Sequence, residues 1–318
     1  MKKYLLLLLF LPFLGSCSLN KLVINKVSDA LSGSDANTVF LGDDDPRLVG
    51  DALPFAIKMY ETLLDKNPDH PGLILVTGSL FVMYANAFVQ GPAEMLPLHQ
   101  YEEKRQEMER AKKLYLRGVS ILERGINNKY PGMLTEWGLE ESPDFTQSLS
   151  KMKKEDISLF YWYSAGTLSA YALNAFDLNL GLRVPRILSI MNKAYELDSN
   201  FNRGAIDELF LIIYGALPEG MGGDTEKALL HYQRALEKSG GEMAGPYVAY
   251  AQTIAVRNQD YEDFKTNLEK ALSIDPAADR NNTLLNTINQ NKARFLLEKA
   301  PELFADLENW DNFEYDDD

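Results

Sequence analysis

Cysteine and histidine are scarce in this sequence, which limits the chemistry available to the chain. Its 318 residues include one cysteine, Cys17, and three histidines, His70, His99 and His231. A single cysteine cannot form an internal disulfide. No histidine has a second histidine or a cysteine at the spacing of metal ligands, and no His-Glu-x-x-His segment occurs. We therefore expect neither a metal centre nor a bound cofactor.

The sequence also lacks the loops that common enzymes use to bind phosphate or to present a nucleophile. Neither Gly-x-x-x-x-Gly-Lys-Ser/Thr nor Gly-x-Ser-x-Gly occurs. The glycine cluster at 220–223 has no preceding strand and lacks phosphate-binding spacing, so we interpret it as a turn between helices. We expect no catalytic residues and predict that the protein is not an enzyme.

Positive charge is in short supply as well. The chain has 32 Lys and Arg against 46 Asp and Glu, a formal net charge of −14, and it ends in an acidic tail at 311–318. Nucleic-acid backbones are recognised by clustered Lys and Arg, so we expect no nucleic-acid partner. The same charge repels anionic lipid surfaces, and a basic patch cannot hold the protein at a membrane.

The apolar run at the start of the chain is too short to span a membrane. It extends from Tyr4 to Leu14, about eleven residues, whereas a membrane-spanning helix needs about twenty. Two lysines precede it and Gly15-Ser16-Cys17 follows, which is typical of a secretory signal and resembles a bacterial lipobox. We predict a signal peptide at 1–16 and a periplasmic lipoprotein anchored through lipidated Cys17. A plain cleaved signal with an incidental cysteine is the alternative.

The remainder of the sequence is helical in pattern. Residues 17–50 are rich in Ser, Asn, Gly and Asp and are interpreted as a tether. From 51 to 310, apolar residues recur at spacings of three and four, which predicts an all-α domain. Within it, small and large residues alternate as in tetratricopeptide repeats of about 34 residues. Second-helix patterns are Ala56/Tyr60/Leu63/Pro68, Ile187/Met191/Ala194, Ala228/Tyr232/Ala235 and Phe264/Leu268/Ala271/Pro276, and first-helix patterns are Ile74/Thr77/Gly78/Phe81 and Trp162/Ala165/Gly166/Ser169.

These small residues have a physical purpose, because helices approach closely only where side chains are small. Gly78 and Gly166 are therefore expected at close helix crossings. One hairpin cannot bury its own apolar face, so about four of them should stack into a solenoid with a concave surface. We expect the segment 281–308 to form a C-terminal capping helix. The segments 91–109 and 130–150 interrupt the array as insertions.

Several motifs make the chain resemble the T component of tripartite ATP-independent periplasmic (TRAP) transporters. They are LPEGMGGDTEKALLHYQRAL from Leu217, followed by GPYVAYAQ, ALSIDP and NTINQNKARFLL, and upstream SLFVMYANAFVQGPAE and FYWYSAGTLSAYALNAFDL. The resemblance implies a tetratricopeptide-like lipoprotein that associates with itself, as a trimer, around a partly apolar pore or cleft. It also implies that the body docks the substrate-binding protein of the transporter.

The candidate binding residues lie on two predicted first helices that carry more aromatic groups than one packed face can take. Tyr84, Phe88, Trp162 and Tyr163 are expected to contribute to an apolar cleft on the concave face. Burial of all four against a neighbouring hairpin or a second subunit is the alternative. Asn86 interrupts the apolar pattern and needs a partner, so it is either a satisfied core amide or a pore-facing polar group.

Two functions remain open from the sequence. The first is an adaptor subunit of a TRAP transporter that docks a substrate-binding protein and holds an apolar or amphipathic ligand. The second is a structural scaffold of the cell envelope with no ligand of its own, as many tetratricopeptide proteins are.

Overall fold

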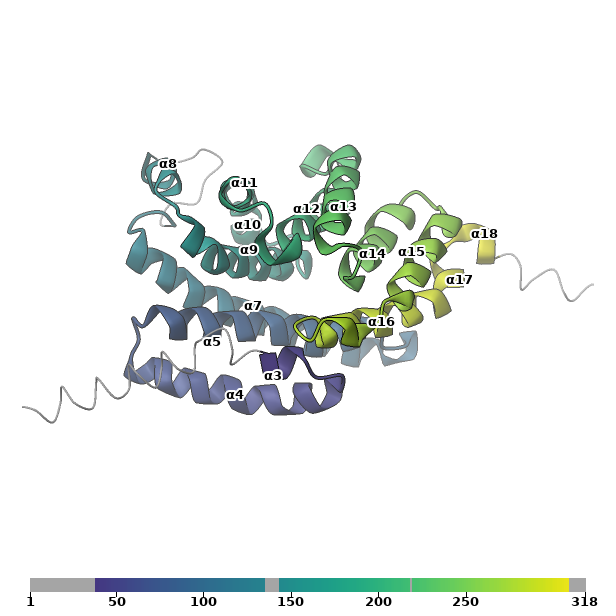
Figure 1. Cartoon of the computed structure of the whole chain (residues 1–318), viewed down its shortest axis with the longest axis horizontal. Coiled ribbons are helices and arrows are strands. Elements are labelled where there is room, and N and C mark those ends of the chain that lie inside the picture. The colour runs from purple at the N-terminus through teal and green to yellow at the C-terminus, as the bar shows by residue number, and fades with distance from the viewer. Residues whose placement is uncertain (1–37, 135–142, 218, 309–318) are drawn as a thin grey trace, which may run out of the picture.

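The protein is an all-α array of helical hairpins, which confirms the predicted fold class (Figure 1). A computed structural model describes residues 38–308, except 135–142 and 218, and these described residues contain no β-strand. The predicted signal peptide, Cys17, the tether up to residue 37 and the acidic tail lie outside the described residues.

The helices fall into three consecutive groups along the chain. The first group is α3 (Thr38–Leu41), α4 (Pro46–Lys66), α5 (Pro71–Tyr84), a π-helical segment (Ala85–Gln90), α6 (Gly91–Glu94) and α7 (Tyr101–Lys129). The second is α8 (Pro143–Ser150), α9 (Ile157–Ala172), α10 (Leu178–Gly181), α11 (Val184–Leu197), α12 (Ala205–Ala216) and α13 (Thr225–Ser239). The third is α14 (Ala244–Tyr250), a π-helical segment (Ala251–Ala255), α15 (Tyr261–Ser273), α16 (Thr283–Glu298), α17 (Ala300–Leu303) and α18 (Ala305–Glu308).

Aspartate side chains fix where several of these helices begin. The Asp45 carboxylate accepts hydrogen bonds from two backbone N–H groups of the first turn of α4, and Asp224 and Asp260 cap α13 and α15 in the same way. Because of the Asp45 cap, the first long helix begins at Pro46, five residues before residue 51, where the sequence pattern predicted that the helical domain begins.

The predicted repeat pattern matches the packing of the helices. In α15, Phe264, Leu268 and Ala271 have no exposed surface, and Ile187, Met191 and Ala194 of α11 are equally buried. Both predicted glycines lie at close crossings. A Cβ atom added to Gly78 would lie 3.1 Å from the Gly118 carbonyl of α7, and one added to Gly166 would lie 2.7 Å from Val82.

The central helix of the first half is α7, which the repeat pattern did not identify. It packs against both α5 and α9 and contributes Tyr115 and Leu122 to the core. The first residues of α7, together with α6 and a 3₁₀ turn, occupy the predicted insertion at 91–109. The repeat pattern did not identify α7 because the exposed face of this helix is dense in Glu, Lys and Arg.

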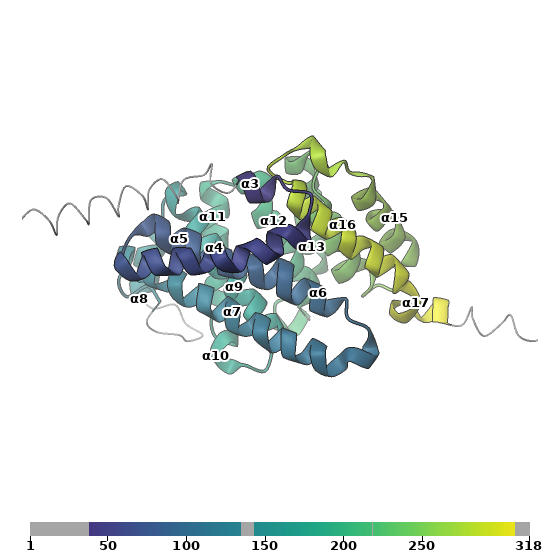
Figure 2. The same cartoon turned by 90° about the horizontal axis from the view of Figure 1, so that it is seen from below.

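The last long helix returns to the beginning of the described chain. The predicted capping segment 281–308 consists of α16 followed by the short α17 and α18. Besides covering α14 and α15, α16 contacts α3 and α4, and Figures 1 and 2 both show it beside them. The Lys292 ammonium lies 3.0 Å from the Glu94 carboxylate of α6. The last long helix of the described chain therefore packs against its first helices, and the array closes on itself.

One described helical stretch, Pro71–Glu94, is long and apolar enough to cross a membrane by length and composition. More than half of its most apolar window is buried in the fold, where α4, α7 and α9 pack against α5. These contacts are those of a core helix.

Candidate functional site

A cavity of about 420 Å³ lies where helices from all three groups meet. It is bordered by α3, α5, α9, α12 and the start of α16, elements that are distant in sequence. Apolar side chains on its wall include Phe40, Leu80, Met83, Trp162 and Leu285. Polar side chains on its wall include Asn202, Arg203, Glu208, Asp279 and Asn282. The site thus combines an apolar surface with a few polar groups, as small-molecule sites usually do.

The aromatic part of the wall comes from α9. Consecutive helical residues point about 100° apart, so the aromatic run on this helix divides between two surfaces. Phe160 and Tyr163 have no exposed surface and pack in the core, whereas Tyr161 and Trp162 line the cavity. The rings of Tyr161 and Trp162 meet edge to face, with centroids 5.4 Å apart and planes at 80°.

Glu208 projects from the first part of α12 into the cavity wall. It is half-buried, and its carboxyl group lies so close to α14 that a Cβ atom at Gly245 would be 3.0 Å from the Glu208 Cδ. No group of the described residues donates a hydrogen bond to this carboxylate or forms an ion pair with it. Burial raises the pKa of Glu208 to about 7. Burial also raises the pKa of Tyr161, with a further contribution from the charge of Glu208.

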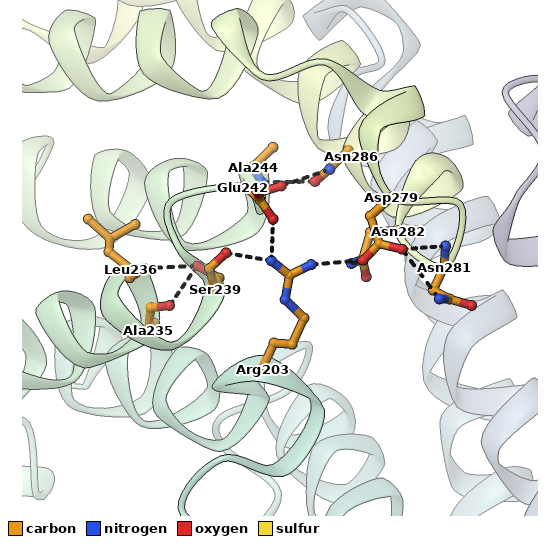
Figure 3. A network of polar contacts seen from close by, with 10 residues as sticks. All are labelled: Arg203, Ala235, Leu236, Ser239, Glu242, Ala244, Asp279, Asn281, Asn282 and Asn286. Atoms are coloured by element: carbon orange, nitrogen blue, oxygen red, sulfur yellow. Dashed lines mark hydrogen bonds and ion pairs between the residues drawn. The ribbon is translucent and has the colours of Figure 1, made fainter.

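Arg203 occupies another part of the cavity wall and is fully engaged with neighbouring groups (Figure 3). Its guanidinium donates to the Asp279 carboxylate at 2.8 Å, to the Ser239 carbonyl at 2.6 Å and to the Glu242 carboxylate. Asp279 in turn accepts from the Asn281 backbone N–H, which together with Arg203 holds the pKa of Asp279 below its usual value. Arg203 therefore joins the end of α13 to the segment before α16.

The backbone that carries Arg203 is in an unusual conformation. Asn202, Arg203 and Gly204 have φ values of 42°, 57° and 98°, three consecutive residues in the left-handed region. Glycine adopts such values without a steric penalty and asparagine does so more readily than most residues, whereas for Arg203 the conformation is unfavourable.

A second polar cluster lies behind the cavity, inside the α12–α13 hairpin. Asp207 has no exposed surface, accepts a hydrogen bond from Lys238 Nζ at 2.6 Å and lies 2.8 Å from His231 Nδ1. Every member of the cluster has a partner, which is the arrangement of a structural link between two helices. Across the described part of the chain, no group of three or more His, Cys, Asp or Glu residues could hold a metal ion.

Comparison with known proteins agrees with this architecture. The profile of the family described as TRAP transporter T-component matches residues 42–304, nearly all of the described chain. The chain belongs to the TRAP transporter T-component family. It is also similar to an uncharacterized protein of Treponema pallidum (strain Nichols), with 32% identity over 304 residues, 92% of this chain and 94% of that protein.

Membership in the T-component family confirms the resemblance noted in the sequence motifs. It associates the chain with a TRAP transporter, as a transport-related subunit that is periplasmic or membrane-associated. One of the motifs, GPYVAYAQ, begins in α14 and ends in the π-helical segment that follows, and its first residue, Gly245, lies beside the Glu208 carboxyl group. The family motif and the cavity are therefore physically adjacent in this T component.

The structure brings only one of the five predicted site residues of this T component into the central cavity. Trp162 lines it. Tyr163 is completely buried in the core, because it points about 100° away from Trp162 around the helix. Tyr84 and Phe88 stack on each other, with centroids 5.8 Å apart, and do not line the cavity. Asn86 is exposed, so it is not a buried core amide, and it is also absent from the cavity wall.

The π-helical segment Ala85–Gln90 explains why Phe88 lies outside the cavity. A π-turn holds an extra residue, so side chains after Tyr84 rotate out of the α-helical register of α5. The Phe88 ring packs toward α4, where a Cβ atom at Gly50 would lie 2.7 Å from it.

The residues that sequence reasoning missed are Tyr161, Arg203 and Glu208. A signal for Glu208 was present, since Asp207 and Glu208 are two carboxylates inside the otherwise apolar run AIDELFLIIYGA. Acidic residues in such a run need partners or a polar site. No local signal marked Arg203, because its partners lie at least 36 residues away in sequence.

Proposed function

We propose that this chain is a periplasmic adaptor subunit of a TRAP transporter that holds an apolar or amphipathic ligand in the central cavity. The observation that carries the proposal is the cavity of about 420 Å³, whose lining combines apolar side chains such as Trp162, Leu80 and Met83 with polar groups. Pockets of this size and composition are suited to enclose a small molecule. In this proposal the chain also docks the substrate-binding protein of the transporter and passes the ligand to it.

Tryptophan fluorescence tests whether the cavity holds a ligand. The chain has three tryptophans, of which only Trp162 is in the cavity wall, while Trp137 and Trp310 lie outside the described residues. A Trp137→Phe/Trp310→Phe variant therefore reports on the cavity alone, and Trp162→Phe is the matched control. Titration with 1-decanol should shift or quench the Trp162 emission saturably and leave the control unchanged. An emission that does not respond would contradict the ligand-holding role.

The anchoring part of the proposal rests on Cys17, which follows the short apolar run and Gly15-Ser16. If Cys17 carries lipid, the Cys17→Ser protein should move to the soluble fraction after the signal peptide is removed. Retention of the processed Cys17→Ser protein in the membrane fraction would mean that something other than lipid on this residue holds it there.

Docking and self-association are tested with purified components. We propose that the mature chain forms a homo-oligomer, a trimer by family resemblance, that binds the substrate-binding protein encoded with the transporter permease. Analytical ultracentrifugation should show a species larger than the monomer, and adding that binding protein should give a heavier complex. A monomer that binds nothing at micromolar concentrations would contradict both statements.

A cell-envelope scaffold without a ligand is the second candidate. It is favoured by the burial of Tyr163 in the core and by the mutual stacking of Tyr84 and Phe88, which give these aromatic groups structural roles. Genes for a two-part permease and a solute-binding protein beside this gene would favour the adaptor over the scaffold.

A further inference from the structure

The polar side of the cavity has an unbalanced charge. Three charged side chains line it, Arg203, Glu208 and Asp279, and Tyr161 is the other titratable group on the wall among the described residues. Arg203 is paired with Asp279 inside the wall and with Glu242 beside it. Glu208 is left as the charged group without a counterion among the described residues. The lining therefore has a net negative charge when Glu208 is ionised.

We infer that the cavity selects ligands that carry an ammonium-type cation on an apolar body, and that Glu208 is the residue that receives the cation. This inference rests on the proposed ligand-holding role and adds the chemical class of the ligand. It follows from the position of an unpartnered carboxylate on the wall of an otherwise largely apolar cavity.

Burial of a carboxylate away from water is unfavourable unless hydrogen bonds or an opposite charge compensate it. The two fully buried carboxylates of the described residues have that compensation, Asp156 through Lys129 and Asp207 through Lys238 and His231. Glu208 is the adjacent residue on the same helix and has none among the described residues. A bound cation would provide that counterion, and burial without one raises the pKa of Glu208.

The aromatic groups beside Glu208 suit the same class of ligand. Trp162 and Tyr161 line the cavity together with Glu208, and the faces of such rings attract organic cations. Apolar residues of α5 that also line the cavity, Leu80 and Met83, can take a hydrocarbon body. An anionic ligand, in contrast, could form an ion pair with Arg203 only if the ion pair between Arg203 and Asp279 were broken.

Three probes with one apolar body separate the contribution of the head group from that of the cavity. Decylammonium, decanoate and 1-decanol are titrated into the full mature chain by calorimetry at pH 8.5, below the concentrations at which they form micelles. Decylammonium should bind at least about tenfold more tightly than either other probe, a difference of about 1.4 kcal/mol. Glu208→Gln should remove that advantage and leave 1-decanol binding within about threefold.

Two further arms control for damage to the fold. Glu237→Gln removes an exposed glutamate of the neighbouring helix α13 and should leave all three affinities unchanged. The wild-type chain at pH 5.5, where Glu208 is protonated, should lose most of the preference for decylammonium. This second arm needs no substitution, so it applies even where Glu208→Gln fails to fold.

The outcomes distinguish this inference from the proposed function. Equal affinities for the three probes, or tighter binding of decanoate, would overturn cation selection while leaving the ligand-holding role intact. An ammonium preference that survives Glu208→Gln would overturn the role of Glu208. Failure of all three probes to bind would overturn both the inference and the ligand-holding role.

Discussion

Glu208 links the chemistry of the cavity to the stability of the fold. Its pKa of about 7 lies above that of a glutamate in the unfolded chain, so the folded protein binds the proton more tightly. The stabilisation by this group is complete at low pH and is lost as the pH rises through about 7. Glu208→Gln removes the ionisation and should therefore raise the free energy of unfolding at pH 8 by about 1–3 kcal/mol.

Urea unfolding of wild type and Glu208→Gln at pH 4 and pH 8 measures this effect. At pH 4 the two proteins should differ little, because Glu208 is then protonated. Glu237→Gln replaces an exposed glutamate and is the control. Its free energy of unfolding should differ little from that of the wild type at either pH. A Glu208→Gln protein that is no more stable than wild type at pH 8 would show that the carboxylate is well solvated.

Gly78 is a second position where a single residue decides the packing. Its added Cβ would lie 2.8 Å from Leu122 Cδ2 and 3.1 Å from the Gly118 carbonyl. Gly78→Ala should therefore lower the free energy of unfolding by about 1–3 kcal/mol in urea. Gly220→Ala is the matched control, since nothing lies within 4 Å of its Cβ, and it should stay within about 0.5 kcal/mol. Equal free energies of unfolding for the two variants would contradict a close approach of α5 and α7 at Gly78.

At the scale of elements, Arg203 holds the C-terminal hairpins against the middle of the chain. It bridges α13 and the segment before α16, and Asn286 of α16 binds the Ala244 N–H and the Glu242 carbonyl (Figure 3). Replacing Arg203 with Met retains the apolar stem but removes the hydrogen bonds. We expect a loss of about 1–3 kcal/mol of stability and faster hydrogen exchange across 276–298.

Arg105→Met provides the comparison for that experiment. Arg105 also forms an ion pair, with Glu102 at 2.9 Å, but both side chains are more than half exposed, and such pairs contribute little. Hydrogen exchange that rises equally in both variants, or that is unchanged in Arg203→Met, would mean that Arg203 does not hold α16 in place.

The elements themselves were largely predictable from sequence, for a physical reason. A repeat is defined by local contacts, so the spacing of Phe264, Leu268 and Ala271 already specifies which face of α15 is buried. The predicted spacing of buried residues was wrong after Tyr84, because the π-helical segment adds a residue to the turn and helical spacing does not predict it. The repeat pattern also missed α7, whose sequence is dense in charged residues before Leu114.

At the scale of the whole molecule, closure of the array could not be read from repeats. The contacts of α16 with α3 and α4, and the pair Lys292–Glu94, join residues roughly 200 or more positions apart. Repeat spacing describes how a hairpin meets its neighbours and contains no information about the curvature that accumulates along the array. The cavity depends on that closure, since its wall takes Phe40 from α3 and Leu285 from α16. The sequence therefore identified Trp162 as a candidate binding residue but could not predict the other residues that line the cavity.

The proposed function requires that the cavity holds a small molecule in the cell. Ser79 lines the cavity from α5, and Ser79→Phe places a ring in the space that a ligand would occupy. Mass spectrometry under non-denaturing conditions, on protein isolated from its own host, should find a bound small molecule on the wild type and none on Ser79→Phe, with equal helical circular dichroism. A wild-type protein with the mass of the processed chain alone, or the same adduct on both proteins, would contradict the account.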